Sequence, residues 1–309
     1  MLEIKKNVLM KNYTTFRIGG PAKFFAEVKS KEELLEALKY AKDNKLDFFI
    51  LGGGSNLLVS DKGFSGIVIK IHDTSYMIHN TLIKCDAGIP LALVVNLATQ
   101  NSLSGMEWAA GIPGTIGGAI RGNAGAFGGC VADVIDTVKA LDTNNLQPVT
   151  YRKEDCQFKY KNSIFKQDPN LIIMSAIIKL QSGNKEESQR KIQEIIAKRS
   201  TRHPLDLGSA GSFFMNPVVA SEELCKKFEE ESGSCCEGRR IPAAWLVDQS
   251  GLKGKKIGGA MVSEKHTGFI VNTGNATAED VIILVSLIKQ QVRDKFGVEL
   301  IEEVQYLGF

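Results

Sequence analysis

One stretch of the sequence, residues 111–129, is unusually rich in glycine. It reads GIPGTIGGAIRGNAGAFGG and holds eight glycines in nineteen residues, whereas 30 glycines in 309 residues would give about two. Glycine loses the most backbone entropy on ordering, so such a cluster persists where the backbone needs positive φ or must lie against a ligand without a Cβ in the way. We therefore interpret this stretch, the glycine-rich segment, as a backbone cradle for a phosphate-bearing cofactor.

A second glycine-rich motif, GGGSNLL at residues 52–58, follows the apolar run from Phe48 to Leu51. This order predicts a strand that leads into a bend, where successive N–H groups can face an anion. Two such loops in one domain indicate one extended ligand. The alternative, an ordinary tight β-turn, stays open for residues 52–58 taken alone.

Neither motif matches the common nucleotide-binding loops. Gly52 and Gly54 begin a G-x-G-x-x-G pattern, but Leu57 stands at its last position, and the residues that follow are β-branched rather than helical. Neither motif ends in Gly-Lys-Ser/Thr, so the P-loop arrangement is excluded. We expect both loops to lie between strands and to bind through turns.

The bulk properties indicate an enzyme with a sizeable core. A chain of 309 residues with 43% hydrophobic and 24% charged residues is long enough for two or three domains. A net charge of +3 does not favour a nucleic-acid partner. The first residues lack a signal-peptide pattern, and no run approaches the roughly 18 apolar residues of a spanning helix, so we expect a cytoplasmic protein without a membrane partner.

The cysteines and the hydrophobic periodicity complete the outline. Six cysteines without a C-x-x-C motif predict neither a disulfide framework nor a metal site. A capping box at Ser30–Glu33 predicts a helix, and Pro90 precedes another at 91–100. Strands are expected at 48–51, 66–71, 82–86, 134–141 and 171–180. A charged helix at 184–200, helices near 221–231 and 277–295 and a final strand at 298–306 follow. The pattern predicts an α+β fold that changes character near residues 183–203.

The second half of the chain contains two places with candidate chemistry. The motif SAGSFFMNP surrounds Ser212 with small residues and ends in Asn216-Pro217, so it offers a hydroxyl and an amide to a ligand. An ordinary polar turn explains it as well. In the expected final strand, Glu302 and Glu303 point to opposite faces. One carboxyl in a cleft would have a raised pKa and could act as an acid, although paired surface glutamates are the commoner case.

A third candidate place is the sequence CQFKYKNSIFK at residues 156–166, just past the middle of the chain. It alternates aromatic residues with Lys159, Lys161 and Lys166. A lysine in such a place offers a point charge to a carboxylate. The edge of a solvated strand would look much the same, so both interpretations stay open.

The sequence resembles the bacterial UDP-N-acetylenolpyruvoylglucosamine reductases, the flavoenzymes of peptidoglycan precursor synthesis. The resemblance runs over nearly the whole chain, and its motifs occur in the family's order. Those motifs are NYTTFRIGGPA (12–22), GGGSNLL, EWAAGIPGTIGG from Glu107, NAGAFG, YKNSIF, GSFFMNP, AAWLVDQSGLKG (243–254), IGGAMVSEKHTGFIVN (257–272) and EEVQYLG. Each motif alone is weak evidence, but together they are specific.

The resemblance implies a fold and a reaction. It implies an α+β protein with an FAD-binding domain of the vanillyl-alcohol oxidase (PCMH) type over residues 1–190, in subdomains of about 1–70 and 71–190, and a smaller α+β substrate-binding domain over 200–309. The implied activity is the reduction of UDP-N-acetylenolpyruvoylglucosamine to UDP-N-acetylmuramate by NADPH through FAD. Such an enzyme serves cell wall biogenesis, cell shape and cell division, and we expect it to be a monomer whose partner is the UDP-sugar.

The resemblance also assigns residues to roles. It implies Ser212 as proton donor, Glu303 as second catalytic residue and Lys161 where the family has arginine. A lysine keeps the charge but lacks the planar fork that grips a carboxylate. Implied cofactor-binding residues are Gly52, Gly53, Gly54, Ser55, Asn56, Leu57, Gly111, Gly114, Thr115, Gly117, Gly118, Asn123 and Gly125. Implied substrate-binding residues are Tyr160, Asn216, Lys253 and His266.

The chain departs from the family at a second position as well. Met215 replaces a basic residue that is common in the family, and Lys253 and Lys265 are candidates to supply the missing charge. The chain between Ser163 and Ser212 is too short for the inserted loop of one subgroup, so we place it in the loop-lacking type. Two alternatives are an FAD-linked oxidase or dehydrogenase of alcohols or hydroxy acids, and a non-catalytic protein that binds the UDP-sugar.

Overall fold

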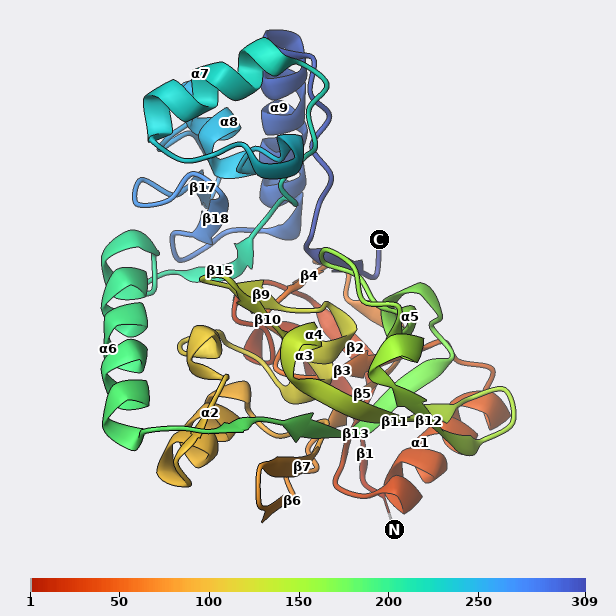
Figure 1. Ribbon diagram of the computed structural model, residues 1–309. Coiled ribbons are helices and arrows are strands. Elements are labelled where there is room, and N and C mark those ends of the chain that lie inside the picture. Colours follow the sequence, from red (N-terminus) through yellow and green to blue (C-terminus); the bar gives the residue numbers. More distant parts are fainter. Residues whose placement is uncertain (1) are drawn as a thin grey trace. The chain divides into compact units, whose positions relative to one another are not determined.

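The computed structural model describes residues 2–309, and these residues form two compact units (Figure 1). The first unit comprises the chain up to Val8 together with Ala22–Gly53 and Ser65–Arg199. The second comprises Leu9–Pro21, Gly54–Phe64 and Ser200–Phe309. Each unit is therefore built from separate stretches of sequence, and the domain boundaries expected at 190 and 200 stay a prediction.

The first unit contains a four-stranded sheet in the order β1-β2-β5-β3. Its strands are β1 (Ile4–Leu9), β2 (Pro21–Val28), β5 (Phe64–Ile71) and β3 (Phe48–Leu51), and β3 runs parallel to β5. Helix α1 (Lys31–Asp43) packs its apolar stripe into a core with Ile67 and Ile69. The Ser30 side chain accepts a hydrogen bond from the Glu33 N–H, and Glu33 accepts one from the Lys29 N–H at 2.7 Å. The predicted helix and its Ser30 cap are confirmed, but the capping box is not closed, because Glu33 accepts from Lys29 rather than from Ser30.

A five-stranded antiparallel sheet makes up the rest of the first unit's framework, in the order β12-β11-β13-β7-β6. The strands are β12 (Gln147–Arg152), β11 (Ile135–Asp142), β13 (Leu171–Lys179), β7 (Leu82–Asp86) and β6 (Tyr76–His79). Helices α2 (Leu91–Gln100) and α3 (Ile116–Arg121) contribute to the core that covers this sheet. The strands expected at 82–86, 134–141 and 171–180 and the helix at 91–100 are confirmed.

Shorter elements connect these parts of the first unit. They are β8 (Leu103–Ser104), which pairs with β14 (Gln181–Ser182), the hairpin β9 (Gly125–Ala126) and β10 (Gly129–Cys130), the helices α4 (Val131–Val134) and α5 (Ile164–Gln167), and the 3-10 turns η2 (Glu107–Ala109) and η3 (Lys153–Cys156). The long charged helix α6 (Lys185–Arg202) follows. The expectation that the glycine-rich segment is a loop between strands is wrong in part, because α3 lies inside it and begins at the Thr115 cap.

The second unit contains a small antiparallel sheet in the order β15-β18-β17-β16. Its strands are β15 (Gly208–Ser212), β18 (Phe269–Asn272), β17 (Ala260–Val262) and β16 (Lys256–Ile257). Around it lie α7 (Glu222–Ser232), α8 (Ala243–Gln249) and α9 (Ala278–Phe296), with the turns η1 (Met10–Asn12) and η4 (Glu237–Arg239). Helices α7, α8 and α9 share one apolar core. The helices predicted near 221–231 and 277–295 are confirmed.

The final strand is shorter than the sequence predicts. Strand β19 covers only Gln305–Leu307 and pairs in parallel with the three-residue β4 (Leu57–Val59). Before it, Glu302 forms an isolated bridge with Phe214, and the Glu303 N–H donates to the Phe213 carbonyl at 2.8 Å. The expected strand at 298–306 is therefore wrong over most of its length, because the partner strand β4 offers only three residues to pair with.

No helix within residues 2–309 is long and apolar enough to cross a membrane. No group of three or more histidine, cysteine, aspartate or glutamate side chains in that range is arranged to hold a metal ion.

Candidate active site

The glycines at 52 and 53 lie against the start of the glycine-rich segment within the first unit. A Cβ added to Gly53 would stand 2.7 Å from the Gly114 Cα, and one added to Gly52 would stand 2.6 Å from the Thr115 Oγ1. Real Cβ atoms do not approach other atoms this closely. The two motifs are thus packed directly against each other here, Gly53 against the Gly114 backbone and Gly52 against the Thr115 side chain.

Gly118 differs from these packed glycines. It lies in α3 and is exposed, and a Cβ added there would meet nothing nearer than the Thr115 Oγ1 at 3.7 Å. Protein packing therefore gives no reason for glycine at this position. A ligand that lies against the backbone would give one. Gly111 and Gly114 have positive φ values of 73° and 118°, which favour glycine whatever the ligand.

The later glycines of the motif are explained within the protein. Gly117 lies against Ala87, since a Cβ there would stand 2.9 Å from the Ala87 Cβ, and Gly125 lies against Cys130 and Gly129 in the β9-β10 hairpin. In the other motif, a Cβ added to Gly54, which belongs to the second unit, would clash with the Tyr13 carbonyl. Their expected contacts with a cofactor stay predictions.

Asn123 has a clear structural task. Its Oδ1 accepts a hydrogen bond from the Ala132 N–H at 3.1 Å, and its Nδ2 donates to the Lys159 carbonyl at 2.9 Å. Both ends of this largely buried amide are thus occupied. Asn123 therefore ties the glycine-rich segment to the chain just before Tyr160 and Lys161, and its predicted role in cofactor binding remains a prediction.

A tight turn presents Tyr160 and Lys161. The backbone groups of Lys159 and Asn162 bond to each other in both directions, and Lys161 adopts a left-handed φ of 53°. The Lys166 ammonium donates to the Lys161 carbonyl at 2.9 Å. This built turn, followed by α5, replaces the solvated strand edge that we left open.

A partly buried arginine that the sequence did not single out, Arg121, lies beside this turn. The fully buried Ser163 hydroxyl donates to the Arg121 carbonyl at 2.7 Å. Burial lowers the pKa of the Arg121 guanidinium. Arg121 stands inside the quoted motif GGAIRGNAG, so its position was visible in the sequence, but nothing there indicated that its charge would be buried.

In the second unit, the backbone brings Ser212 and Glu303 together. Ser212 ends β15 and pairs with Phe269, and an irregular register with a positive φ at Gly211 leaves Ser212 exposed. The next residue, Phe213, accepts the Glu303 N–H at 2.8 Å. Asn56 adds a second hydrogen bond to Glu303, from its Nδ2 to the Glu303 carbonyl at 3.1 Å. The backbone of Glu303 is thus held against Phe213, the residue next to Ser212, which brings the two predicted catalytic residues close together.

The neighbouring glutamate has a different environment. The Lys289 ammonium of α9 donates to the Glu302 carboxylate at 2.9 Å. This ion pair anchors Glu302 to a helix, whereas the Glu303 backbone is held beside Ser212. The structure therefore separates the two glutamates that the sequence pattern left equivalent.

A cavity of about 220 Å³ in the second unit contains two of the predicted substrate-binding residues. Lys253 and His266 line it, together with Lys265 and five others: Ala244, Trp245, Asp248, Glu264 and Thr267. The Phe213 N–H donates to the Gly268 carbonyl, so the wall that carries His266 is joined to the strand that carries Ser212. The cavity has the cations that an anionic ligand needs, beside two carboxylates.

His266 is held as a neutral ring. Burial is the main cause that lowers its pKa, and its Nδ1 accepts a hydrogen bond from the Gly268 N–H at 3.1 Å. An Nδ1 that accepts places the proton on Nε2. The ring packs against Phe269 with centroids 5.0 Å apart. His266 therefore offers one donor rather than a charge.

Asn216 is used by the fold. Its Oδ1 accepts from the Ala243 N–H at 3.1 Å, at the first residue of α8, and its carbonyl accepts from Arg240 at 2.7 Å. An amide that caps a helix start satisfies an N–H that would otherwise lack a partner. Its predicted contact with the substrate remains a prediction.

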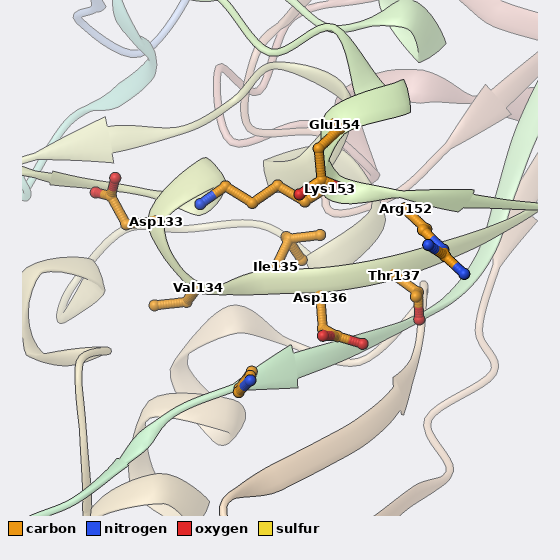
Figure 2. Close-up of a pocket in the computed structure, with 9 residues that line it drawn as sticks. Asp133, Val134, Ile135, Asp136, Thr137, Arg152, Lys153 and Glu154 are labelled. Carbon is orange, nitrogen blue, oxygen red and sulfur yellow. The ribbon is translucent and has the colours of Figure 1, made fainter.

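A larger cavity of about 440 Å³ lies on the first unit, and none of the predicted site residues lines it (Figure 2). Its charged lining balances three acidic and three basic side chains: Asp133, Asp136, Glu154, Arg152, Lys153 and Lys179. Because none of the predicted site residues lines this cavity, we assign it no part in the site.

Comparison with known proteins agrees with this arrangement. Residues 22–145 match the family model of an FAD binding domain, and residues 203–307 match that of the UDP-N-acetylenolpyruvoylglucosamine reductase C-terminal domain. The expected α+β fold, with an FAD-binding domain followed by a smaller C-terminal domain, is confirmed.

Curated relatives and a solved structure cover the chain almost end to end. The UDP-N-acetylenolpyruvoylglucosamine reductase of Caldanaerobacter subterraneus subsp. tengcongensis is 42% identical over 98% of this chain and 93% of its own. That of Clostridium novyi is 37% identical over 99% and 92%. The crystal structure of the Thermus caldophilus enzyme is 32% identical, covers 99% of this chain and 100% of its own, and has a TM-score of 0.79. The chain belongs to the UDP-N-acetylenolpyruvoylglucosamine reductase family.

Proposed function

We propose that this chain reduces UDP-N-acetylenolpyruvoylglucosamine to UDP-N-acetylmuramate, with FAD as bound cofactor and NADPH as reductant. The observation that carries the proposal is the fixed pair of Ser212 and Glu303, joined through the Phe213 backbone at 2.8 Å, in a chain of this reductase family. A reductase of an enol ether needs a proton donor beside a group that steadies developing negative charge.

The residues of the first unit fit an FAD. Gly118 leaves open space at the surface of α3, and the left-handed φ values of Gly111 and Gly114 turn the backbone where a side chain would be strained. Such a backbone admits a ligand at close range and presents N–H groups to its phosphates. Bound FAD supplies the hydride that originates in NADPH.

Ser212 and Glu303 act on the substrate side of the reaction. Reduction of the enolpyruvyl double bond builds negative charge at the carbon beside the substrate carboxylate, and Ser212 delivers a proton to that carbon. A serine hydroxyl is a weak acid in water, so it serves here because it is positioned beside a much stronger base. A hydrogen bond from the Glu303 carboxyl group stabilises the developing charge in this proposal, and it strengthens as the charge grows.

Lys161 neutralises the substrate carboxylate in this proposal. The built turn at 159–162 and the bond from Lys166 fix the backbone that carries it. A single ammonium provides charge without a bidentate fork. Tyr160, which is 42% exposed in the same turn, is proposed to contact the same end of the substrate.

The cavity with Lys253 and His266 is proposed to receive the nucleotide part of the substrate. Lys253 and Lys265 supply the two cations that a diphosphate attracts, and they replace the positive charge that is missing at Met215. Lys265 also contacts Asp206 at 3.4 Å, an exposed pair that screening weakens. The neutral His266 offers a hydrogen bond to an uncharged part of the nucleotide.

We also propose the wider setting of the enzyme. It acts as a cytoplasmic monomer without a nucleic-acid partner, and its product serves the cell wall, cell shape and cell division. The FAD-binding domain is proposed to end near residue 190, and the substrate-binding domain to begin near residue 200.

The test is a two-step spectroscopic titration of the purified protein. The protein is expected to be yellow, to lose its flavin absorbance on addition of NADPH without oxygen, and to regain it when the enolpyruvyl sugar nucleotide is added. Reoxidation by oxygen alone, with no response to the sugar nucleotide, would support the oxidase alternative. A colourless protein that binds the sugar nucleotide would support the non-catalytic alternative.

A further inference from the structure

Arg199 lies across the glycine-rich segment, inside the first unit. Its guanidinium carbon stands 5.1 Å from the centre of the Phe127 ring. On another side its chain passes Gly111, where an added Cβ would come within 2.9 Å of the Arg199 Cδ. A single arginine thus contacts both the beginning of the segment and its far end.

Within residues 2–309, the Arg199 guanidinium has no charged partner, and the Phe127 ring is the group that it contacts by its charge. Its Nε is the one buried side-chain nitrogen or oxygen without a hydrogen bond in the part of the chain that the structure describes. Over residues 2–309, Arg199 takes part in no ion pair with a carboxylate, and burial lowers the pKa of its guanidinium. Arg199 as a whole is half-buried, but its Nε is a buried donor without an acceptor, and each such donor calls for a specific explanation.

The backbone around Arg199 is shaped to hold it there. Phe127 and Gly128 form the turn between β9 and β10 with φ values of 50° and 82°, and a left-handed φ is strained for a bulky aromatic residue. The Phe127 ring remains 47% exposed. A ring beneath a guanidinium attracts it by a cation–π contact while its N–H donors stay available. The strained turn therefore positions a cation without neutralising it.

We propose that Arg199 is a further cofactor-binding residue, which donates hydrogen bonds to an anionic oxygen of the FAD in the glycine-rich segment. This inference rests on the proposed function. Two parts of FAD have that chemistry: the diphosphate, and the carbonyl edge of the isoalloxazine ring, which gains negative charge on reduction. A planar guanidinium suits either oxygen.

The experiment compares Arg199→Met and Arg199→Lys with a matched control, Arg190→Met. Arg190 is an exposed arginine on the same helix, α6. FAD is titrated into each full-length apoprotein while flavin fluorescence is followed, and circular dichroism checks the fold. Arg199→Met is expected to bind FAD about tenfold more weakly, as loss of one charge-assisted hydrogen bond implies. Arg199→Lys should lose less, and Arg190→Met should match the wild type.

The midpoint potential of the bound flavin distinguishes the two oxygens. If Arg199 faces the diphosphate, FAD affinity falls and the potential stays unchanged. If it faces the ring, the potential falls, by about 30 mV for a tenfold loss in relative affinity for the reduced form. If Arg199→Met does not fold, the FAD affinity and the midpoint potential of Arg199→Lys test the inference in its place.

Wild-type FAD affinity and wild-type potential in the folded Arg199 variants would overturn the inference. A wild-type protein that binds no FAD would instead overturn the proposed function, so the two failures can be told apart.

Discussion

Replacing Gly118 with alanine should move stability and cofactor affinity in opposite directions. Gly118 lies within α3, and the added methyl would meet only the Thr115 Oγ1 at 3.7 Å, an ordinary contact. Alanine in place of a helical glycine stabilises the fold by about 0.5–1 kcal/mol. The methyl would, however, separate a closely bound FAD from the backbone. Loss of one hydrogen bond to a charged phosphate costs about 1.5–3 kcal/mol, or roughly 10- to 150-fold in FAD affinity.

Urea unfolding of the apoprotein and an FAD titration measure the two effects separately. Gly122→Ala is the matched control, because Gly122 ends the same helix with a negative φ of −89° and an added Cβ would stand 3.6 Å from the Gly118 carbonyl. It should leave FAD affinity unchanged. A Gly118→Ala protein that is more stable and binds FAD as tightly as the wild type would refute the reasoning, because the cofactor could not then lie against α3.

Four further expectations concern the substrate side. Ser212→Ala should leave flavin reduction by NADPH near normal and slow reoxidation by the enolpyruvyl substrate by about 10²-fold or more in stopped-flow measurements; reoxidation at wild-type speed would remove serine from the mechanism. Glu303→Gln should also slow reoxidation of the flavin by the substrate. Glu302→Gln should leave this rate unchanged and lower the free energy of unfolding by less than about 1 kcal/mol, because the ion pair of Glu302 with Lys289 is partly exposed. Equal kinetic losses in the two variants would contradict the different roles of the two glutamates. Lys161→Ala should slow reoxidation and Lys161→Arg should be tolerated, while equal loss in both half-reactions would indicate a structural role. Since burial lowers the pKa of His266, the unfolded chain binds its proton more readily, so stability should fall as pH drops below about 6.5, and His266→Gln should flatten that part of the urea-unfolding profile.

The parts of the fold that the sequence predicted correctly are those with local causes. The Ser30 cap of α1 and the proline before α2 act within one helical turn, so they needed no knowledge of the tertiary structure. The length of the final strand was predicted wrongly, because it is set by the pairing partner and not by the β-propensity of its own residues. Its partner β4 has three residues, and the chain at Glu302 and Glu303 bonds to Phe214 and Phe213 instead.

The site shows the same division between local and distant causes. The family motifs pointed to Ser212 and Glu303, which lie 91 positions apart in the chain. Only the hydrogen bond between Phe213 and Glu303 shows why both belong to one site. Asn56, Asn123 and Asn216 were expected to contact ligands, yet each side chain bonds to a backbone group that holds a candidate residue or helix in place. An amide can donate and accept at once, so it joins separate stretches of backbone as readily as it binds a ligand. Their predicted ligand contacts stay predictions, and we expect that replacing any of the three would disturb the geometry of the site through the loss of these backbone contacts.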